Sequence, residues 1–177
     1  MARLPILKHP DPRLRQLANP VTAFDDDLAT LVEDMLETMY SADAIGLSAP
    51  QVDDHRRVLV IDPTVSRDEP QIFINPEIQS RAKFALVEEG CLSVPDMVGN
   101  VVRATEVAVT AYDRHGASFQ HQLSGMAAVS LQHEIDHLDG TLFIDRLSMV
   151  EKLRMRVFAP ALYRRARDLQ RAEVERR

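Results

Sequence analysis

The stretch Ser124-Gly-Met-Ala-Ala-Val-Ser-Leu-Gln-His-Glu-Ile-Asp-His-Leu-Asp-Gly140 predicts a helix around which the rest of the fold can be arranged. Serine is favoured at a helix N-cap, and glycine is typical of the position that ends a helix. Apolar residues and two histidines recur at intervals of three and four, which places them on one helical face. The residues of this face are Met126, Val129, Ser130, His133 and His137.

The segments before this helix predict one more helix and a sheet. Residues 24–42 carry apolar side chains with a helical period, and residues 41–51 predict a loop because they contain Gly46 and Pro50. Short β-rich runs follow, and the turn Asp113-Arg-His-Gly116 between the last two favours a mostly antiparallel sheet. These runs are residues 58–62, 71–75, 83–87, 98–112 and 118–123.

The segment after the helix predicts a C-terminal helix. Ser148, with Glu151 three residues later, forms a capping-box pattern, and Pro160 should kink or divide the helix. Strands in the middle with helices at both ends indicate an α+β fold, in which mostly antiparallel sheet packs around the central helix. We expect a single catalytic domain over residues 1–147 and a helical extension of that domain over residues 148–177.

Size and composition exclude several classes of protein. The 177 residues fit one domain, and 45% hydrophobic with 27% charged residues is typical of a globular chain. A net charge of −6 argues against a protein that binds nucleic acid over its whole surface, so we expect no DNA partner. No apolar stretch approaches the length of a membrane span. We therefore expect no membrane association and a cytoplasmic location.

The segment His133-Glu-Ile-Asp-His137 is the first candidate for chemistry. Two histidines one helical turn apart can reach one metal ion, and Glu134 between them can act as a base. The competing interpretation is that both histidines are solvated helix residues. Catalytic sites of this type use three protein ligands, so a third ligand must come from elsewhere.

Cys91, the one cysteine of the chain, is the best candidate for that third ligand. It stands in the segment Glu88-Glu-Gly-Cys-Leu-Ser-Val-Pro95, where Gly90 and Pro95 indicate a site loop more than a strand interior. A buried cysteine that packs as a small hydrophobe is the common alternative. A set of one thiolate and two imidazoles suits zinc or iron(II).

Three separated motifs, in order, resemble those of the peptide deformylase family, and the resemblance covers nearly the whole chain. They are Ala44-Ile-Gly-Leu-Ser-Ala-Pro-Gln51, Glu89-Gly-Cys-Leu-Ser93 and Gln132-His-Glu-Ile-Asp-His137. The first departs from the family pattern twice, because Ala44 stands where glycine is common and Ser48 where alanine is common. Ala44 would matter if the backbone there needed a positive φ.

The resemblance implies hydrolysis of the formyl group from the N-terminal methionine of nascent polypeptides, with release of formate. It implies one divalent metal ion per chain, held by Cys91, His133 and His137. Fe²⁺ is favoured in the cell, and Zn²⁺, Ni²⁺ or Co²⁺ would also fit in preparations. Glu134 would carry the proton, while the Gln51 side-chain amide and the Leu92 backbone N–H would stabilise charge on the carbonyl oxygen.

A pocket for the methionine side chain should lie beside the metal. Its expected residues, which could instead be ordinary core, are Ile45, Val87, Met126 and Val129, while Gly46 and Gly90 would leave room for the peptide backbone. Glu89 and Arg103 match positions that pair in the family, and such a pair would support the cysteine segment. An exposed, weak ion pair is the alternative.

Three other functions compete with this hypothesis. A non-catalytic metal-binding protein would close the site with a fourth protein ligand, which leaves no use for Glu134 or Gln51. A zinc endopeptidase is suggested by the two histidines alone, but not by Cys91. A diverged paralogue that acts on another acylated amine is kept open by Ala44 and Ser48.

The C-terminal segment, residues 148–177, is basic. It holds nine basic and four acidic residues, a charge of +5, so that the rest of the chain carries −11. The family resemblance implies that such a helix can dock on the ribosome, whose surface is largely RNA phosphate. A solvated helix whose arginines only keep the protein in solution is an equal alternative.

Overall fold

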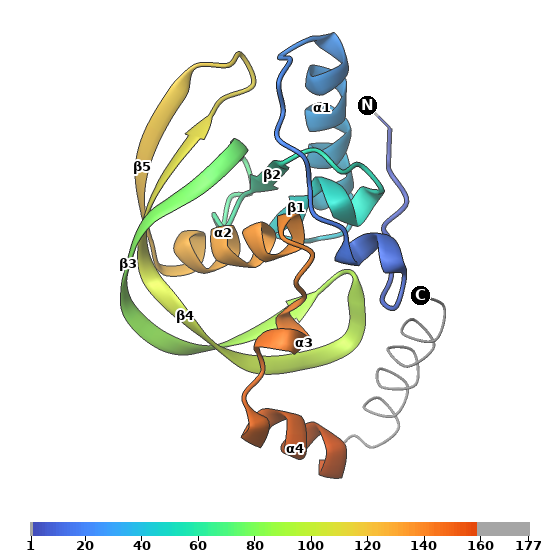
Figure 1. The fold of residues 1–177 in the computed structure, drawn as a ribbon, viewed down its shortest axis with the longest axis vertical. Coiled ribbons are helices and arrows are strands. Elements are labelled where there is room, and N and C mark those ends of the chain that lie inside the picture. The colour runs from blue at the N-terminus through green and yellow to red at the C-terminus, as the bar shows by residue number, and fades with distance from the viewer. Residues whose placement is uncertain (1, 159–177) are drawn as a thin grey trace.

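A computed structural model describes residues 2–158, which form a five-stranded antiparallel sheet with helices packed against it (Figure 1). The strand order follows the sequence, from β1 to β5, so the two short strands β1 and β5 form the edges of the sheet. The strands are β1 (Gly46–Ser48), β2 (Val58–Ile61), β3 (Gln71–Cys91), β4 (Val94–Tyr112) and β5 (Ser118–Ser124). The helices are η1 (Pro12–Arg15), α1 (Asp26–Ser41), η2 (Ala49–Val52), α2 (Gly125–Leu138), α3 (Phe143–Arg146) and α4 (Met149–Phe158).

The α+β class and the antiparallel sheet are confirmed, but β3 differs from the prediction. The runs at 71–75 and 83–87 belong to one long strand rather than two. The residues between them are mostly polar and solvent-facing, yet their backbone continues to pair with β4. Pro76 lies at a register shift next to Asn75, whose φ is +50°, and a bulge is where a strand tolerates proline.

Helix α1 follows the predicted range closely. The Asp25 side chain accepts a hydrogen bond from the Leu28 N–H at 3.0 Å, which caps the first turn. The apolar stripe of α1 packs with β1 and β2 in one buried cluster, which includes Leu28, Val32, Met35, Met39, Leu47 and Val60. This cluster fixes the position of the chain just after α1.

Helix α2 lies in the hollow of the curved β3–β4 hairpin and contacts β1, β2, β4 and β5 (Figure 1). Its apolar residues Leu131 and Leu138 are fully buried, in a cluster that includes Phe73 of β3 and Val109 of β4. The helix ends as predicted, with Gly140 at a φ of +66° just beyond it. Ser124 stands at the N-cap, but its side chain makes no capping hydrogen bond.

Two segments that were predicted as loops contain regular secondary structure. Residues 41–51 contain the edge strand β1, which pairs with β2, and the 3-10 helix η2. Cys91 is the last residue of β3, and only Leu92 and Ser93 separate it from β4. Gly90 and Pro95 indicated a loop, but the chain turns tightly and both residues remain within paired strands. The backbone partners across a hairpin are not visible in the local sequence.

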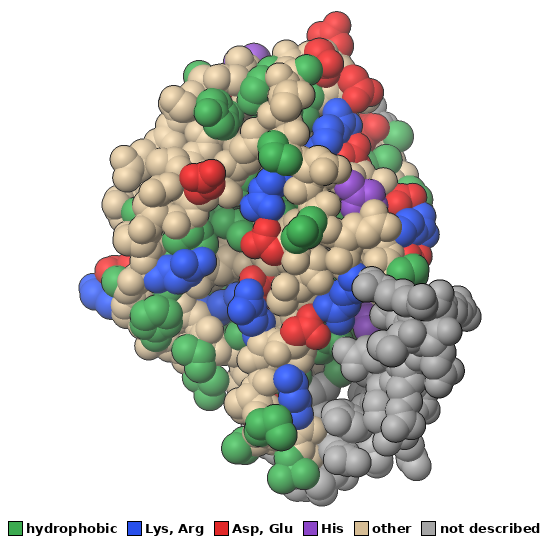
Figure 2. Space-filling view, in the orientation of Figure 1, with side chains coloured by type: hydrophobic (Ala, Val, Ile, Leu, Met, Phe, Trp, Pro, Cys, Tyr) green, Lys and Arg blue, Asp and Glu red, His purple; other side chains and the backbone are tan. Residues whose placement is uncertain are grey.

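The chain after α2 carries two helices within the described residues. The short α3 was not predicted, whereas α4 begins where expected, with the Glu151 N–H donating to the Ser148 hydroxyl at 3.1 Å. Met149, Val150 and Leu153 are exposed, and Figure 2 shows hydrophobic side chains at this end of the molecule. The predicted kink at Pro160 lies outside the described residues. None of the described helices could span a membrane.

Candidate metal centre

Cys91 of β3 and two histidines of α2 converge at one point. The ligand atoms of Cys91, His133 and His137 all lie within 4.8 Å of one another, and Cys91 Sγ is 3.2 Å from His137 Nε2. The helical turn places the two imidazoles on the same face, and the strand end brings the thiol to them. Cys91 also packs at the edge of an apolar cluster, so both predicted environments meet at this residue.

The three side chains fit a divalent metal ion. Tetrahedral ligands at the usual zinc distances of about 2.0–2.3 Å lie roughly 3.3–3.6 Å from one another, so small shifts would suffice. Burial, and next the positive charges of His133, Arg15 and Arg103, holds the pKa of His137 well below its usual value. A neutral imidazole is the form that binds a cation. A thiolate with two imidazoles is a donor set for zinc, iron(II) or a related ion.

Glu89 orients His133 from behind. Its Oε2 is 2.8 Å from His133 Nδ1, which leaves Nε2 of that ring free to face Cys91. Burial lowers the pKa of His133, but contacts with Cys91 and Glu89 outweigh this effect and hold the pKa well above its usual value. A metal cation bound at Nε2 of His133 would take the place of the proton that this nitrogen otherwise carries.

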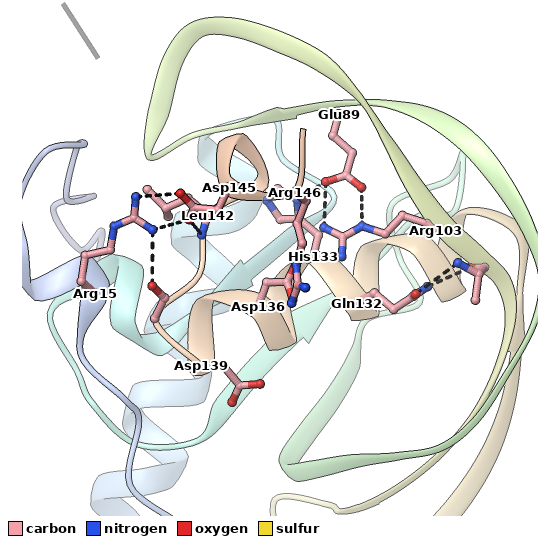
Figure 3. A network of polar contacts seen from close by, with 12 residues as sticks. Arg15, Glu89, Arg103, Gln132, His133, Asp136, Asp139, Leu142, Asp145 and Arg146 are labelled. Atoms are coloured by element: carbon pink, nitrogen blue, oxygen red, sulfur yellow. Dashed lines mark hydrogen bonds and ion pairs between the residues drawn. The ribbon is translucent and has the colours of Figure 1, made fainter. Parts of the chain in front are cut away.

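Arg103 of β4 connects Glu89 to α2 (Figure 3). It donates to Glu89 through Nε at 2.6 Å and Nη2 at 3.1 Å, and to Asp136 through Nη1 at 2.7 Å. Arg146 donates to the other oxygen of Asp136 at 2.7 Å. Glu89 and Arg103 are only 6% and 5% exposed, so the alternative of an exposed ion pair is wrong.

The network keeps Glu89 ionised. Burial raises the pKa of this carboxyl, but hydrogen bonds from His133 and Arg103 outweigh it and lower the pKa to about 2. Asp136 and Arg146 were missed as members of this network. Asp136 lies inside the quoted motif, three residues after His133, but nothing in the sequence shows that an arginine from β4 reaches it.

Glu134 is a buried carboxyl beside the three ligand atoms. Its side chain lies against Gly46 of β1, where an added Cβ would come within 2.6 Å of Oε1. Oε2 has no hydrogen-bond partner among the described residues. Burial raises the pKa of Glu134 to about 7, although His133 and the Ser48 hydroxyl act in the opposite direction. A group with a pKa near neutrality can both accept and return a proton.

Gln51 of η2 is buried and is not an exposed loop amide. Its Oε1 accepts hydrogen bonds from the Ser48 N–H at 2.9 Å and the Ser48 hydroxyl at 3.0 Å. Its Nε2 lies 3.6 Å from Cys91 Sγ and 3.2 Å from Ser93 Oγ. Leu92 follows Cys91 in the turn, and its carbonyl accepts a hydrogen bond from Lys8. The side-chain amide nitrogen of Gln51 therefore faces the thiol of Cys91.

A cavity of about 590 Å³ opens beside these groups. Five of the residues predicted for substrate binding line it, namely Ile45, Gly46, Gly90, Met126 and Val129. Ile45 and Met126 are 37% and 50% exposed, which is not the burial of core residues. Val87 is not among the lining residues, because it lies four residues before Cys91 on an extended strand that leads away. Lys8, Met97, Val98 and Ser130 line the cavity without having been predicted.

The departure at Ala44 causes no backbone strain. Ala44 has an ordinary φ, and the left-handed conformation falls on its neighbour Asp43, at +53°. Asparagine and aspartate tolerate this conformation better than other residues with a side chain. The methyl group of Ala44 packs at the edge of the cluster that joins α1 to β1.

Comparison with known proteins gives one consistent answer. A family model described as polypeptide deformylase matches residues 3–153. The peptide deformylase of Cellvibrio japonicus is 50% identical over 88% of this chain and 93% of its own, and that of Hahella chejuensis 48% identical over 88% and 94%.

Solved structures agree with these sequence relatives. A crystal structure of a peptide deformylase from Legionella pneumophila superposes with a TM-score of 0.83 at 44% identity, over 96% of this chain and 98% of that one. The peptide deformylase from Thermotoga maritima gives a TM-score of 0.80 at 40% identity, over 84% of this chain and 99% of that one.

Replacement of Arg103 by methionine should destabilise the fold strongly, because two buried carboxylates lose their shared cation. The expected loss in the free energy of unfolding is about 3–5 kcal/mol, measured by urea denaturation. Arg114→Met provides a control, since Arg114 pairs with Glu33 at the surface and should lose less than about 1 kcal/mol. Similar losses in the two variants would contradict a structural role for the buried network.

Proposed function

We propose that the cavity beside Cys91 is the active site of this chain, which belongs to the peptide deformylase family. As a peptide deformylase, the chain is a hydrolase that removes the N-formyl group from nascent polypeptides. The observation that carries this proposal is the convergence of Cys91, His133 and His137 next to the buried carboxyl of Glu134. In the proposal, these three side chains hold one divalent metal ion, which makes α2 the central metal-binding helix of the fold.

The metal would be Fe²⁺ in the cell, as the family resemblance implies, and Zn²⁺, Ni²⁺ or Co²⁺ suit the same donors. When bound, such a cation would supply Lewis acidity, which would polarise the formyl carbonyl and lower the pKa of water in the site. Glu89 supports this by holding the His133 ring in one orientation.

Glu134 would carry the proton. It accepts a proton from the attacking water while the water oxygen forms a bond to the formyl carbon. It then gives that proton to the amine nitrogen as the C–N bond breaks, so that formate and a free amino terminus leave. A pKa raised toward neutrality by burial suits both transfers, and the space at Gly46 allows the carboxyl to lie there.

Gln51 and Leu92 would stabilise the negative charge that builds on the formyl oxygen. The Gln51 Nε2 group already points toward Cys91, and Leu92 contributes its backbone N–H from the turn just after it. Because these donors are held by the fold, little reorganisation is needed as charge develops.

The apolar part of the cavity would receive the methionine side chain. Ile45, Met126 and Val129 form walls for a long, unbranched side chain. Gly46 and Gly90 line the same cavity and would border the peptide backbone. Val87 is left out of this pocket because it does not line the cavity.

The competing functions receive less support. A closed structural metal site would need a fourth protein ligand. Among the described residues, the group of side chains that could hold a metal ion contains three ligands. A zinc endopeptidase is not supported by the family match, which covers residues 3–153 with a deformylase model. A related enzyme for another acylated amine is disfavoured because the sequence and structural relatives are peptide deformylases.

The domain organisation and the surroundings of the enzyme are also proposals. Residues 1–147 would form the catalytic domain and residues 148–177 its basic extension, although the family match runs on to residue 153. The charge of +5 on this extension would attract it to ribosomal RNA, where formylated chains emerge. We propose a cytoplasmic location for the enzyme, because such a substrate is made there.

Two substitutions separate the proton carrier from the ligands. Glu134→Ala should keep nearly the full metal content while kcat falls at least a hundredfold, because the residue carries a proton and holds no metal. Cys91→Ser should lose metal and activity together, because a hydroxyl replaces a thiolate ligand. Metal analysis and release of formate from formyl-Met-Ala-Ser give the two readouts. Full metal content in Cys91→Ser would remove this residue from the ligand set.

Shortening the substrate side chain tests the pocket. Formyl-Ala-Ala-Ser should react with a kcat/KM at least tenfold below that of formyl-Met-Ala-Ser, because apolar burial worth about 1–3 kcal/mol is lost. Equal values for the two peptides would show that the walls named above do not hold the first side chain.

Removal of the basic extension tests the ribosome proposal. A chain ending at Leu153 retains the region matched by the family model and the Asn100–Glu151 hydrogen bond of 3.1 Å, but loses a charge of +5. It should keep its activity on the tripeptide and co-sediment with ribosomes far less in low salt. A full-length variant with Arg164, Arg165 and Arg167 changed to Glu should also keep its activity on the tripeptide and co-sediment with ribosomes far less. Undiminished co-sedimentation of both would exclude the extension as an anchor.

A further inference from the structure

Ser48 lies at the junction of β1 and η2, directly beside the groups assigned to catalysis. Its side chain is fully buried, and it stands where the family motif commonly has alanine. Its hydroxyl donates to Gln51 Oε1 at 3.0 Å, and its backbone N–H donates to the same oxygen at 2.9 Å. One residue therefore supplies both hydrogen bonds to the carbonyl end of the Gln51 amide.

The other end of the Gln51 amide is also engaged. The two hydrogens of Nε2 face Cys91 Sγ at 3.6 Å and Ser93 Oγ at 3.2 Å. Since an amide oxygen has two lone pairs and an amide nitrogen two hydrogens, this side chain has its full set of partners. A flipped amide would turn its own N–H groups toward the Ser48 N–H, which cannot accept.

We propose that Ser48 is a positioning residue for deformylation, whose hydroxyl holds the Gln51 amide with its Nε2 directed at the site of the formyl oxygen. The inference rests on the proposed role of Gln51. Because Ser48 is fully buried, water does not replace the hydroxyl when it is removed, and the amide oxygen keeps only its backbone partner. The amide then rotates over a wider range, and its donor is less well placed for the developing charge.

The strand that carries Ser48 also borders the side chain of Glu134. Gly46, two residues earlier, makes room for Glu134 on the same short strand. This short strand therefore provides the hydroxyl that holds Gln51 and, at Gly46, the space that Glu134 occupies.

A double-mutant cycle tests the proposal. Ser48→Ala introduces the residue that is common in the family, so the variant is expected to fold. Its kcat on formyl-Met-Ala-Ser should fall about fivefold, with KM within twofold of the original, because the lost hydrogen bond acts on the transition state. In a Gln51→Ala background the same change should have no further effect on kcat.

Control measurements separate positioning from stability. Ser41→Ala removes a surface hydroxyl that bonds to Glu37 on α1, and it should leave kcat unchanged. Metal content and melting temperature are recorded for every variant. The side-chain amide of Gln51, identified in ¹⁵N spectra by its absence from Gln51→Ala, should exchange its protons faster in Ser48→Ala than in the unaltered protein. This last readout is independent of activity.

Two results would overturn the proposal. One is an unchanged kcat together with an unchanged amide exchange rate in Ser48→Ala. The other is an equal fall in kcat in both backgrounds, which would show that Ser48 acts without Gln51. A Gln51→Ala variant with the original kcat would instead remove Gln51 from the mechanism, and the inference with it, while formate release by the unaltered protein would still stand.

Discussion

The buried ion pairs of Arg103 are the interaction on which the arrangement of the site depends. A guanidinium on β4 is held between a carboxylate on β3 and another on α2, so that three elements meet at one cation. Buried charges are stable only when they are paired and hydrogen-bonded, which allows very few relative positions of these elements. The register of the β3–β4 hairpin brings Glu89 to His133, and two residues later it brings Cys91 to the same helix.

The sequence predicts most of the fold because local patterns decide it. The period of α1, the glycine after α2 and the capping pair at Ser148 and Glu151 involve only neighbouring residues, and the structure agrees with each. The continuity of β3 and the pairing of β1 depend on backbone partners far away in the chain, and neither could be found locally. The register shift beside Pro76 is the same kind of feature.

The candidate site divides in a similar way. The motifs identify Cys91, His133 and His137, and the structure brings their ligand atoms together, while their roles remain predictions. Asp136 and Arg146 could not be assigned, because a carboxylate on a helix has no signature that names its partner. Val87 was expected in the pocket because of its apolar type, but its place along the strand decides otherwise. Ser48 drew notice only as a departure from a motif.

The origin of the three candidate ligands from two elements far apart in sequence affects the unfolded state as well as the folded one. Cys91 and the α2 histidines are distant along the chain, so an unfolded chain does not present them together. Any cation that they jointly hold would act as a reversible cross-link across β4 and β5. Closing such a loop costs chain entropy that the folded protein has already lost through its tertiary contacts. Folding and ion binding would then be thermodynamically linked, and chelation would shift the population toward unfolded chains.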